Sequence, residues 1–224
     1  MKVGIIIAIE SELAAFLDSC SNVRSVQVGR KTVYCTSRKG HEVYAVLSGY
    51  GEIDAAAATE MLIIWSHCDL IMNFGVTGAL EPSLRVEDLF VVSKACHYDY
   101  DASAFAPVKK HQYADYPDEF IPLDPDLVRL ARTKIPSLRE TAVASGDRFI
   151  ESREDKEALR ALGCSLCDME IAAIARTCDL NGVRCLSIKC ISDAYDDDSS
   201  AFQNNVRRSA TLAFDAIDQI LEVL

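Results

Sequence analysis

Acidic side chains flank several apolar segments of this chain. Glu12 comes shortly after the apolar residues 3–9, and Asp193 directly follows another apolar run. Asp168 and Glu170 stand just before an alanine-rich segment. Two carboxyl groups can divide acid–base work, because one accepts a proton in its ionised form while the other donates one. For Glu12 the alternative is structural, since the helix dipole stabilises an acid in the first turn.

Other kinds of catalytic or ligand site find less support. There are only four histidines and no G-x-S-x-G motif, which disfavours a Ser/His/Asp triad and a histidine-rich metal site. Cys164 and Cys167 form a lone C-x-x-C without a second pair, so we interpret them as packing residues. The glycine-rich residues 49–51 and 75–78 match neither dinucleotide nor P-loop consensus. We therefore expect neither a metal nor an organic cofactor.

The segments that would hold these acids alternate between two patterns. Residues 3–9 form a continuous β-branched run typical of a strand buried on both faces, and residues 10–16 resemble a helix. We expect further strands at residues 32–37, 42–48, 70–74, 89–93, 143–145 and 183–191. We expect further helices at residues 53–65, 152–162, 169–178 and 210–224, and one that begins at Asp124 and Pro125. This alternation predicts an α/β fold around a mostly parallel or mixed sheet.

The chain shows no internal repeat, linker or change of composition, so we expect one domain over residues 1–224. In α/β sheets, ligands bind beyond the carboxyl ends of the strands, and the acids should therefore converge on one rim. The glycine-rich residues 75–78 are expected to follow a strand that ends at Phe74. Residues 96–125 have no clear period, and an irregular region of this length often carries function.

Composition limits the partners and the compartment. With 23 Lys and Arg against 34 Asp and Glu, the net charge of −11 disfavours binding to nucleic acid and to anionic membranes. The apolar residues 3–9 are too short to span a bilayer and lack the features of a secretory signal. Nine cysteines form an odd, scattered set, which indicates reduced thiols. We expect a cytoplasmic protein.

Seven sequence pieces occur together in a fixed order along the chain. They are M-K-V-G-I-I at 1–6, A-I-E-S-E at 8–12, S-G-Y-G at 48–51, N-F-G-V-T-G-A-L at 73–80, S-G-D-R-F-I at 145–150, D-M-E at 168–170 and I-S-D at 191–193. In these pieces the chain resembles the nucleoside phosphorylase and nucleosidase superfamily, and most closely its methylthioadenosine/S-adenosylhomocysteine nucleosidase branch. The resemblance implies a three-layer α/β/α fold with a mixed central sheet, a homodimer, and hydrolysis of the N-glycosidic bond of adenosines that carry a 5′-thioether.

The resemblance also assigns roles to the residues around the glycosidic bond. Glu12 corresponds to the general base for the attacking water, and Asp193 to the acid that protonates N7 of the departing adenine. Glu170 would hold the ribose 2′- and 3′-hydroxyls, and Met169 would pack against the sugar. The transition state is cationic at the sugar and negative on the base, so one acid must be ionised while the other donates.

Four further residues correspond to the walls of the family's nucleoside pocket. Phe149 would stack on the adenine, and Ile150 would offer backbone groups to its edge. Phe202 and Phe105 would line the pocket for the 5′-thioether, with Phe105 reaching in from the neighbouring subunit. Ordinary core packing is the alternative for Phe149 and Ile150.

Three pocket residues depart from the family pattern. Ile9 replaces a methionine, Val76 replaces a small hydroxyl residue, and Lys189 replaces an arginine before the I-S-D motif, whose Ser192 we also expect at the substrate. Lys189 keeps the charge of arginine but lacks its planar fork. The resemblance therefore implies that the rate or the sugar preference differs from that of the family.

Two other functions stay open at this stage. A phosphorylase must hold a phosphate dianion, whereas this chain offers the amide of Asn73 and the isopropyl group of Val76 at the corresponding positions, which favours water as the nucleophile. A displaced cation such as Arg24 or Arg30 would be needed instead. A nucleoside-binding protein without activity is disfavoured because all three acids are present. The choice among methylthioadenosine, S-adenosylhomocysteine, 5′-deoxyadenosine and futalosine also stays open.

Overall fold

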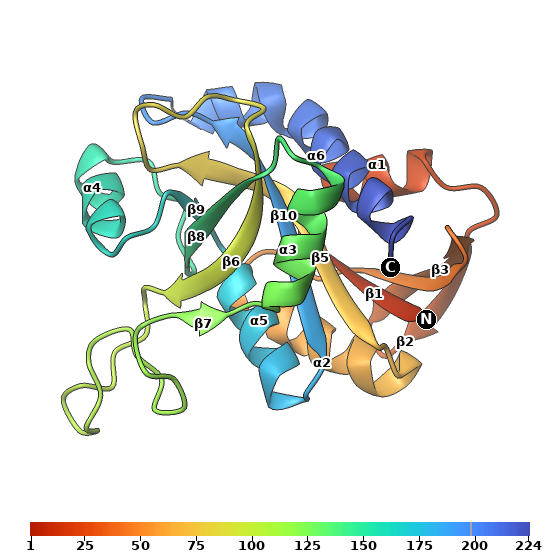
Figure 1. Ribbon diagram of the computed structural model, residues 1–224, viewed down its shortest axis with the longest axis horizontal. Helices are drawn as coiled ribbons and strands as arrows, with labels where there is room; N and C mark the ends of the chain where they lie inside the picture. The colour runs from red at the N-terminus through yellow and green to blue at the C-terminus, as the bar shows by residue number, and fades with distance from the viewer. Residues whose placement is uncertain (198) are drawn as a thin grey trace.

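The computed structural model describes residues 1–197 and 199–224 as a mixed β-sheet with helices on both sides (Figure 1). The strands are β1 (Lys2–Ile7), β2 (Arg24–Val28), β3 (Lys31–Arg38), β4 (His41–Leu47), β5 (Leu70–Ala79), β6 (Leu89–His97), β7 (Ile121–Pro122), β8 (Arg139–Ser145), β9 (Leu166–Asp168) and β10 (Arg184–Asp193). The helices are α1 (Glu10–Asp18), α2 (Glu52–Ser66), α3 (Pro125–Lys134), α4 (Arg153–Ala161), α5 (Ile171–Leu180) and α6 (Ser199–Leu221).

The sheet is mixed and partly closed. Its strand order is β10-β6-β8-β9-β5-β1-β4-β3-β2, and β10 also pairs with β5 in parallel, so five strands form a ring. β1 runs parallel to both β4 and β5, whereas β6 pairs antiparallel with β10. Because β1, β5 and β10 are parallel neighbours, their carboxyl ends share one edge. The predicted three-layer fold with a mixed sheet is thereby confirmed.

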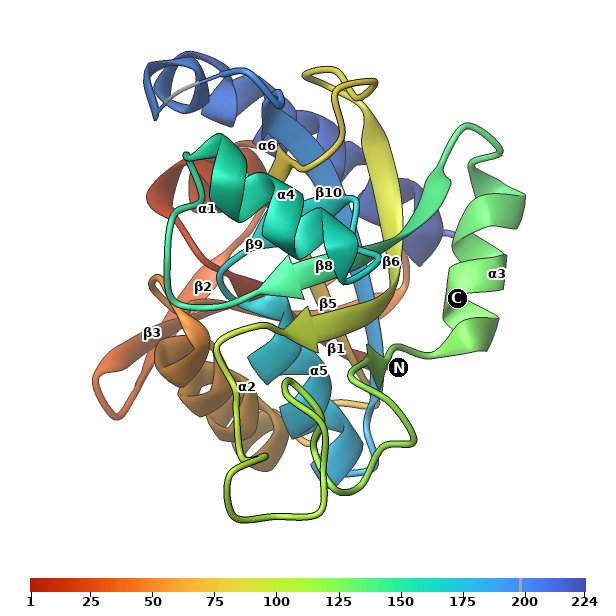
Figure 2. The ribbon, with the colours of Figure 1, turned by 90° about the vertical axis from the view of Figure 1, so that its left-hand side faces the viewer.

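Two apolar cores separate the three layers. On one face of the sheet, α1, α3 and α6 pack over β1, β5 and β10 around side chains such as Phe16, Phe74 and Phe214. On the other face, α2 and α5 pack side by side around Leu62 and Ile174 (Figure 2). A smaller cluster lies beneath α4. The helices therefore fix the sheet from both sides and leave the carboxyl ends of the central strands open to a ligand.

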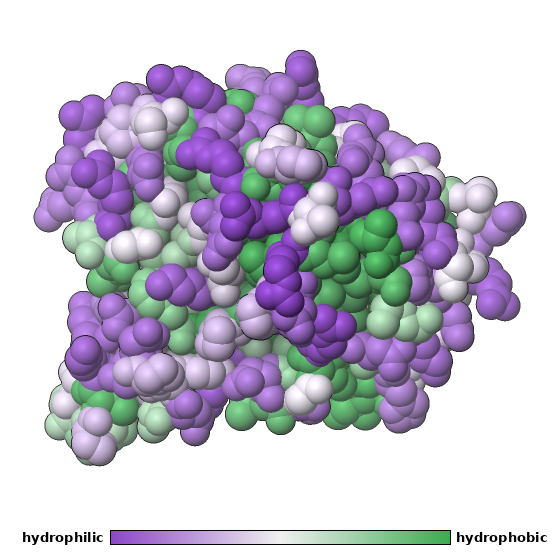
Figure 3. Space-filling view, in the orientation of Figure 1, coloured by the Kyte–Doolittle hydropathy of each residue, from purple (hydrophilic) through white to green (hydrophobic). Residues whose placement is uncertain are grey.

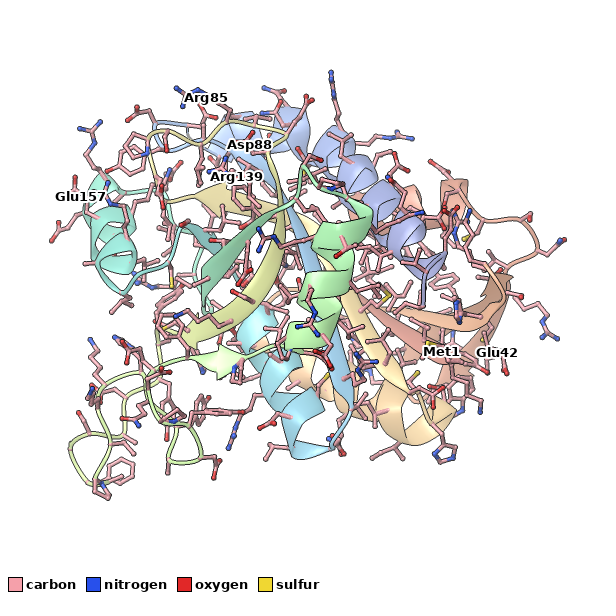
Figure 4. The ribbon with its side chains drawn as sticks, viewed as in Figure 1. Met1, Glu42, Arg85, Asp88, Arg139 and Glu157 are labelled. Carbon is pink, nitrogen blue, oxygen red and sulfur yellow. The ribbon has the colours of Figure 1, made fainter. Side chains whose placement is uncertain are left out.

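Local sequence explains where several elements begin. Asp124 accepts hydrogen bonds from the backbone of Asp126 and Leu127 and caps α3, as its Asp-Pro start predicts. Ser152 caps α4 in the same way. Figure 4 shows Arg85, Asp88 and Arg139 close together, and Asp88 accepts a backbone hydrogen bond from Arg85 and pairs with Arg139 at 3.2 Å. These contacts fix the starts of β6 and β8.

Some boundaries differ from the sequence predictions. β5 does not end at Phe74, because Gly75 to Gly78 continue to pair with β10. β2 was not predicted, since its exposed, mixed sequence lacks an apolar period. β8 starts at Arg139, before the expected residue 143, because its pairing with β6 extends that far. α6 starts at Ser199 rather than 210, with a polar first half that packs on one side only.

The surface in the orientation of Figure 3 is largely hydrophilic, and apolar side chains gather between α3 and the C-terminus. Within residues 1–197 and 199–224, no helix is both long and apolar enough to cross a membrane.

Candidate active site

A cavity of about 280 Å³ opens at the shared edge of β1, β5 and β10. Its wall includes most of the residues that the sequence singled out. They are Ile9, Glu12, Val76, Phe149, Ile150, Met169, Glu170, Ser192, Asp193 and Phe202. Acids from three separate parts of the chain thus meet in one largely apolar cavity, as the rule for the carboxyl ends of α/β strands predicts.

Glu12 lies at the floor of the cavity and is only 2% exposed. Its Oε1 accepts a hydrogen bond from the Val76 N–H at 2.9 Å, and its Oε2 accepts from the Ala8 and Ile9 N–H groups at 3.1 and 3.2 Å. Burial raises the pKa of Glu12, against the charge of Lys189 and these three donors. The bond to Ile9 also caps α1, so the structural alternative for Glu12 is present in the fold.

Two glycines of β5 make room for the acids. A Cβ on Gly75 would lie 2.4 Å from Glu12 Oε1, and a Cβ on Gly78 would lie 2.8 Å from Asp193 Oδ2. Any side chain at either position would displace a carboxyl group. The glycine-rich stretch is therefore not a phosphate loop but a strand across which two carboxylates lie.

Asp193 is the last residue of β10 and is buried. The Ser192 hydroxyl donates a hydrogen bond to its Oδ1 at 2.8 Å. Burial raises the pKa of Asp193, while Ser192 and the charge of Lys156 oppose that change. Lys156 is itself buried and donates to the carbonyl groups of Ala194 and Tyr195 at 3.3 and 2.8 Å. This lysine holds the chain directly after Asp193, and the sequence analysis did not identify it.

Glu170 forms the N-cap of α5 and is buried. Its Oε1 accepts the Gly51 N–H at 3.1 Å. Burial and the charge of Asp168 raise the pKa of Glu170 to about 7, although Lys189 opposes this. The Oε2 of Glu170 accepts the Met169 N–H at 3.3 Å, and the lone pairs that remain on both oxygens can accept from a ligand in the cavity.

Lys189 does not line the cavity but lies beneath it. Its ammonium group is 2.7 Å from Asp168 Oδ2, and both side chains are buried. Burial lowers the pKa of Lys189, but the charges of Asp168, Glu170 and Glu12 outweigh burial and raise it overall. The expected contact between Lys189 and a substrate is therefore replaced by a buried ion pair that balances the acids above it.

Two aromatic rings border the mouth of the cavity. Phe149 and Phe202 meet edge to face with their centroids 5.7 Å apart. Next to them, Glu151 accepts a hydrogen bond from the Ser199 N–H at 3.0 Å, which ties the start of α6 to the segment after β8. Buried Ile150 completes this wall. These three side chains form an apolar part of the cavity wall, here named the aromatic slot, and the carboxyl groups line another part.

Phe105 lies outside the cavity of its own chain. It is 85% exposed and sits in the long irregular segment before β7, which projects from the body of the molecule (Figure 1). Tyr100 and Tyr113 stack within this segment with their centroids 4.0 Å apart, so it is internally ordered. Phe105 is therefore not part of the cavity wall that its own chain forms.

Some cavity residues were not identified from the sequence. Tyr50 and Thr77 lie within the quoted motifs, so their position in these motifs was the available signal. Cys167 also borders the cavity, whereas Cys164 packs beneath α4, and neither forms a disulfide. Arg148 also lines the cavity, and its position within the S-G-D-R-F-I motif was likewise the available signal.

The chain is similar in sequence and in fold to proteins of known function. The family model described as "Phosphorylase superfamily" matches residues 2–222. The chain is 32% identical to the 5′-methylthioadenosine/S-adenosylhomocysteine nucleosidase of Desulfotalea psychrophila, over 99% of both chains. The solved structure of the corresponding nucleosidase from Neisseria meningitidis in complex with methylthio-immucillin-A has a TM-score of 0.93 and 27% identity, covering 100% and 99% of the two chains. The futalosine hydrolase of Helicobacter pylori has the same TM-score with 25% identity, covering 100% and 98%.

Proposed function

The chain belongs to the phosphorylase superfamily, and from this membership and its cavity we propose that it hydrolyses the N-glycosidic bond of 5′-thio-substituted adenosines. Its substrates are 5′-methylthioadenosine and S-adenosylhomocysteine, and its products are adenine and the thioribose. The observation that carries the proposal is the meeting of three buried carboxyl groups, Glu12, Glu170 and Asp193, in one cavity with an aromatic slot.

Glu12 and Asp193 act as base and acid in the proposed reaction. Glu12 in its ionised form accepts the proton of the attacking water and stabilises the cationic sugar. The charge of Lys189 and three N–H donors favour that form, against the burial that raises the pKa of Glu12. Asp193, whose pKa burial raises, delivers a proton to N7 of the leaving adenine. Protonation of the adenine lowers the activation barrier, because negative charge develops on the adenine as the glycosidic bond breaks.

The remaining cavity residues orient the nucleoside. The remaining lone pairs of the Glu170 carboxyl group accept hydrogen bonds from the ribose hydroxyls, and Met169 packs against the sugar. The adenine ring enters the slot beside Phe149, with backbone groups of Ile150 at its edge. This arrangement places the glycosidic bond between the Glu12 and Asp193 carboxyl groups.

Water is favoured over phosphate as the nucleophile. Asn73 is buried and already committed, because its side chain donates to the Ile6 carbonyl at 3.1 Å and accepts from the Ser187 hydroxyl at 2.8 Å. Neither Arg24 nor Arg30 lines the cavity. A phosphate dianion would meet three acids there with no free cation at the floor among the described residues, so a phosphorylase is the weaker alternative.

The proposal is tested by measuring release of the free purine base from a panel of nucleosides, which is adenine for methylthioadenosine and S-adenosylhomocysteine and hypoxanthine for inosine. We expect release from methylthioadenosine and S-adenosylhomocysteine, and much slower release from inosine, which lacks both the 6-amino group and the 5′-thioether. Futalosine belongs in the same panel, because the chain is also similar to a futalosine hydrolase. Release from futalosine alone, or from no nucleoside, would overturn the proposal.

Substitution of Gly75 by alanine tests the packing beneath Glu12. The added methyl group would lie 2.4 Å from Glu12 Oε1, so the carboxylate must leave its three donors. We expect kcat to fall by about 10²-fold, the cost of misplacing a catalytic group by about 1 Å. The measurement is adenine release together with a thermal melt. A native kcat would show that Glu12 needs no defined position.

We also propose that the active form is a homodimer. α2 presents apolar side chains to solvent, including Ile53 at 81% exposure and Ile64 at 60%, and Tyr50 and Phe105 are exposed as well. Monomeric proteins rarely expose such a set of large apolar residues. A second copy that covers this face would bring its Phe105 to the 5′ end of the bound nucleoside.

Substitution of Phe105 by alanine separates this role from folding. We expect KM for methylthioadenosine to rise by about 10-fold, since a buried aromatic contact of 1–2 kcal/mol would be lost, with little change in the melting temperature. The matched control is Leu180→Ala, which removes another exposed apolar side chain, 67% exposed, that does not line the cavity. An unchanged KM in the Phe105 variant would exclude it from the site of either subunit.

A reducing compartment such as the cytoplasm fits the cysteines, and we propose it as the place of action. All nine cysteines are free, and seven of them are buried. Buried thiols that pack in a core have no structural need for oxidation.

A further inference from the structure

Glu52 is a buried acid that the proposed mechanism does not use. It is the first residue of α2 and is 6% exposed. Its Oε1 accepts a hydrogen bond from the Ser145 hydroxyl at 2.6 Å, and its Oε2 accepts the Ala173 N–H at 2.5 Å. Both carboxyl oxygens of Glu52 therefore accept hydrogen bonds from outside α2, one from the end of β8 and one from the start of α5.

These contacts cap the start of α5. Ala172 and Ala173 are in the first turn of this helix, where N–H groups have no partner within the helix. The Ala172 N–H donates to the Ser145 hydroxyl at 3.1 Å, and Ser145 in turn donates to Glu52. Glu52 thus satisfies one N–H group directly and supports the acceptor of another.

The capping is reciprocal. The Gly51 N–H, at the N-cap of α2, donates to Glu170 Oε1 at 3.1 Å, and Glu170 is the N-cap residue of α5. Each helix therefore supplies a carboxylate to the N-terminus of the other. α2 and α5 lie side by side in both ribbon views (Figures 1 and 2), so this exchange fixes the separation of their first turns.

The exchange places like charges close together. Burial raises the pKa of Glu52 to about 8, and the charges of Asp168 and Glu170 add to this effect, against the hydrogen bonds from Ser145 and Ala173. A carboxyl group in such surroundings holds its place through its hydrogen bonds rather than through charge. Glu52 accepts from Ser145 and Ala173, whereas Glu170 accepts from Gly51 and Met169, and both sets of contacts join the starts of α2 and α5.

We propose that Glu52 is a positioning residue for Glu170 and thereby determines how well the enzyme recognises the ribose hydroxyls. By tying the first turn of α5 to the first turn of α2, it keeps the Gly51 N–H on Oε1 of Glu170 and so holds the whole carboxyl group toward the sugar. This inference rests on the proposed function of the cavity and on the role of Glu170 in it.

The test compares two substrates and three variants. The substrates are methylthioadenosine and its 3′-deoxy analogue, which lacks one of the hydroxyls that Glu170 would bind. The variants are Glu52→Ala, Glu52→Gln, and Asp124→Ala as a matched control, because Asp124 also caps a helix with its carboxylate but lies outside the cavity. For each protein, the ratio of kcat/KM for the two substrates is measured, together with the affinity for adenine.

In Glu52→Ala we expect this ratio to fall by about 10-fold, the effect of weakening one hydrogen bond to a charged group. The fall should come from KM for methylthioadenosine, while the 3′-deoxy analogue and adenine are affected little. Glu52→Gln should keep a ratio within about 3-fold of the wild type, because its amide can accept from Ala173 and donate to Ser145. Asp124→Ala should keep the wild-type ratio at a lowered melting temperature.

An equal loss on both substrates would show that Glu52 only stabilises the fold, and an unchanged ratio would show that it does not act through Glu170. Either result overturns the inference. If Glu52→Ala does not fold, Ser145→Ala takes its place, with a smaller fall in the ratio expected and the same result overturning it. If the wild type releases no adenine, the proposed function fails, and the dissociation constants of the two nucleosides then decide the role of Glu52.

Discussion

Replacement of Asp193 by asparagine is expected to abolish adenine release while leaving nucleoside binding nearly intact. The amide keeps the shape of the side chain and still accepts the hydrogen bond from Ser192, but it has no acidic proton for N7 of the adenine. Loss of a general acid lowers kcat by about 10²–10⁴-fold. The measurement is kcat for methylthioadenosine, with the dissociation constant of adenine determined on the same preparation.

Asp196→Asn provides the matched control, because Asp196 is exposed and only three residues further along the chain. It should keep a native rate. A rate close to the wild type in Asp193→Asn would remove Asp193 from the mechanism. A parallel loss of adenine binding would show instead that Asp193 serves mainly to hold the base.

Replacement of Glu12 by glutamine should lower kcat by a similar factor, about 10²–10⁴-fold, because an amide cannot accept the proton of the attacking water. A second effect comes from the backbone. Both oxygens of Glu12 accept N–H groups, so the amide nitrogen would face a donor, and the melting temperature should fall as well.

The control for this variant is Glu10→Gln in the same first turn of α1, where the side chain is exposed. It should retain native kcat and stability. The two roles of Glu12 separate cleanly in this comparison, since kcat is measured well below the melting temperature. A variant with a lowered melting temperature and a native kcat would show that Glu12 only caps its helix.

The sequence predicted the location of the site because its acids stand at strand ends. Glu12 follows β1 closely and Asp193 ends β10, and parallel neighbouring strands bring such positions to one edge of the sheet. Strands buried on both faces, such as β1, produce an uninterrupted apolar run that is visible without a structure. The roles of these acids were implied by the resemblance of the motifs to a known family, and the spacing of the acids alone does not assign them.

The layer beneath the cavity was beyond sequence reasoning. Charged side chains are usually exposed, and burial of Lys156, Lys189 and Glu52 depends on partners from distant elements. Lys189 meets Asp168 only because β10 and β9 are brought together around the ring of strands. The extension of β5 through its glycines has the same origin, since the pairing with β10 decides it rather than local propensity.

The central claim is that water, activated in this cavity, cleaves the nucleoside. The most direct measurement follows adenine release from methylthioadenosine in phosphate-free buffer and again after addition of phosphate, and identifies the sugar product in each case. We predict the same rate in both buffers and free methylthioribose as the only sugar. Release that requires phosphate and yields a sugar 1-phosphate would contradict the account.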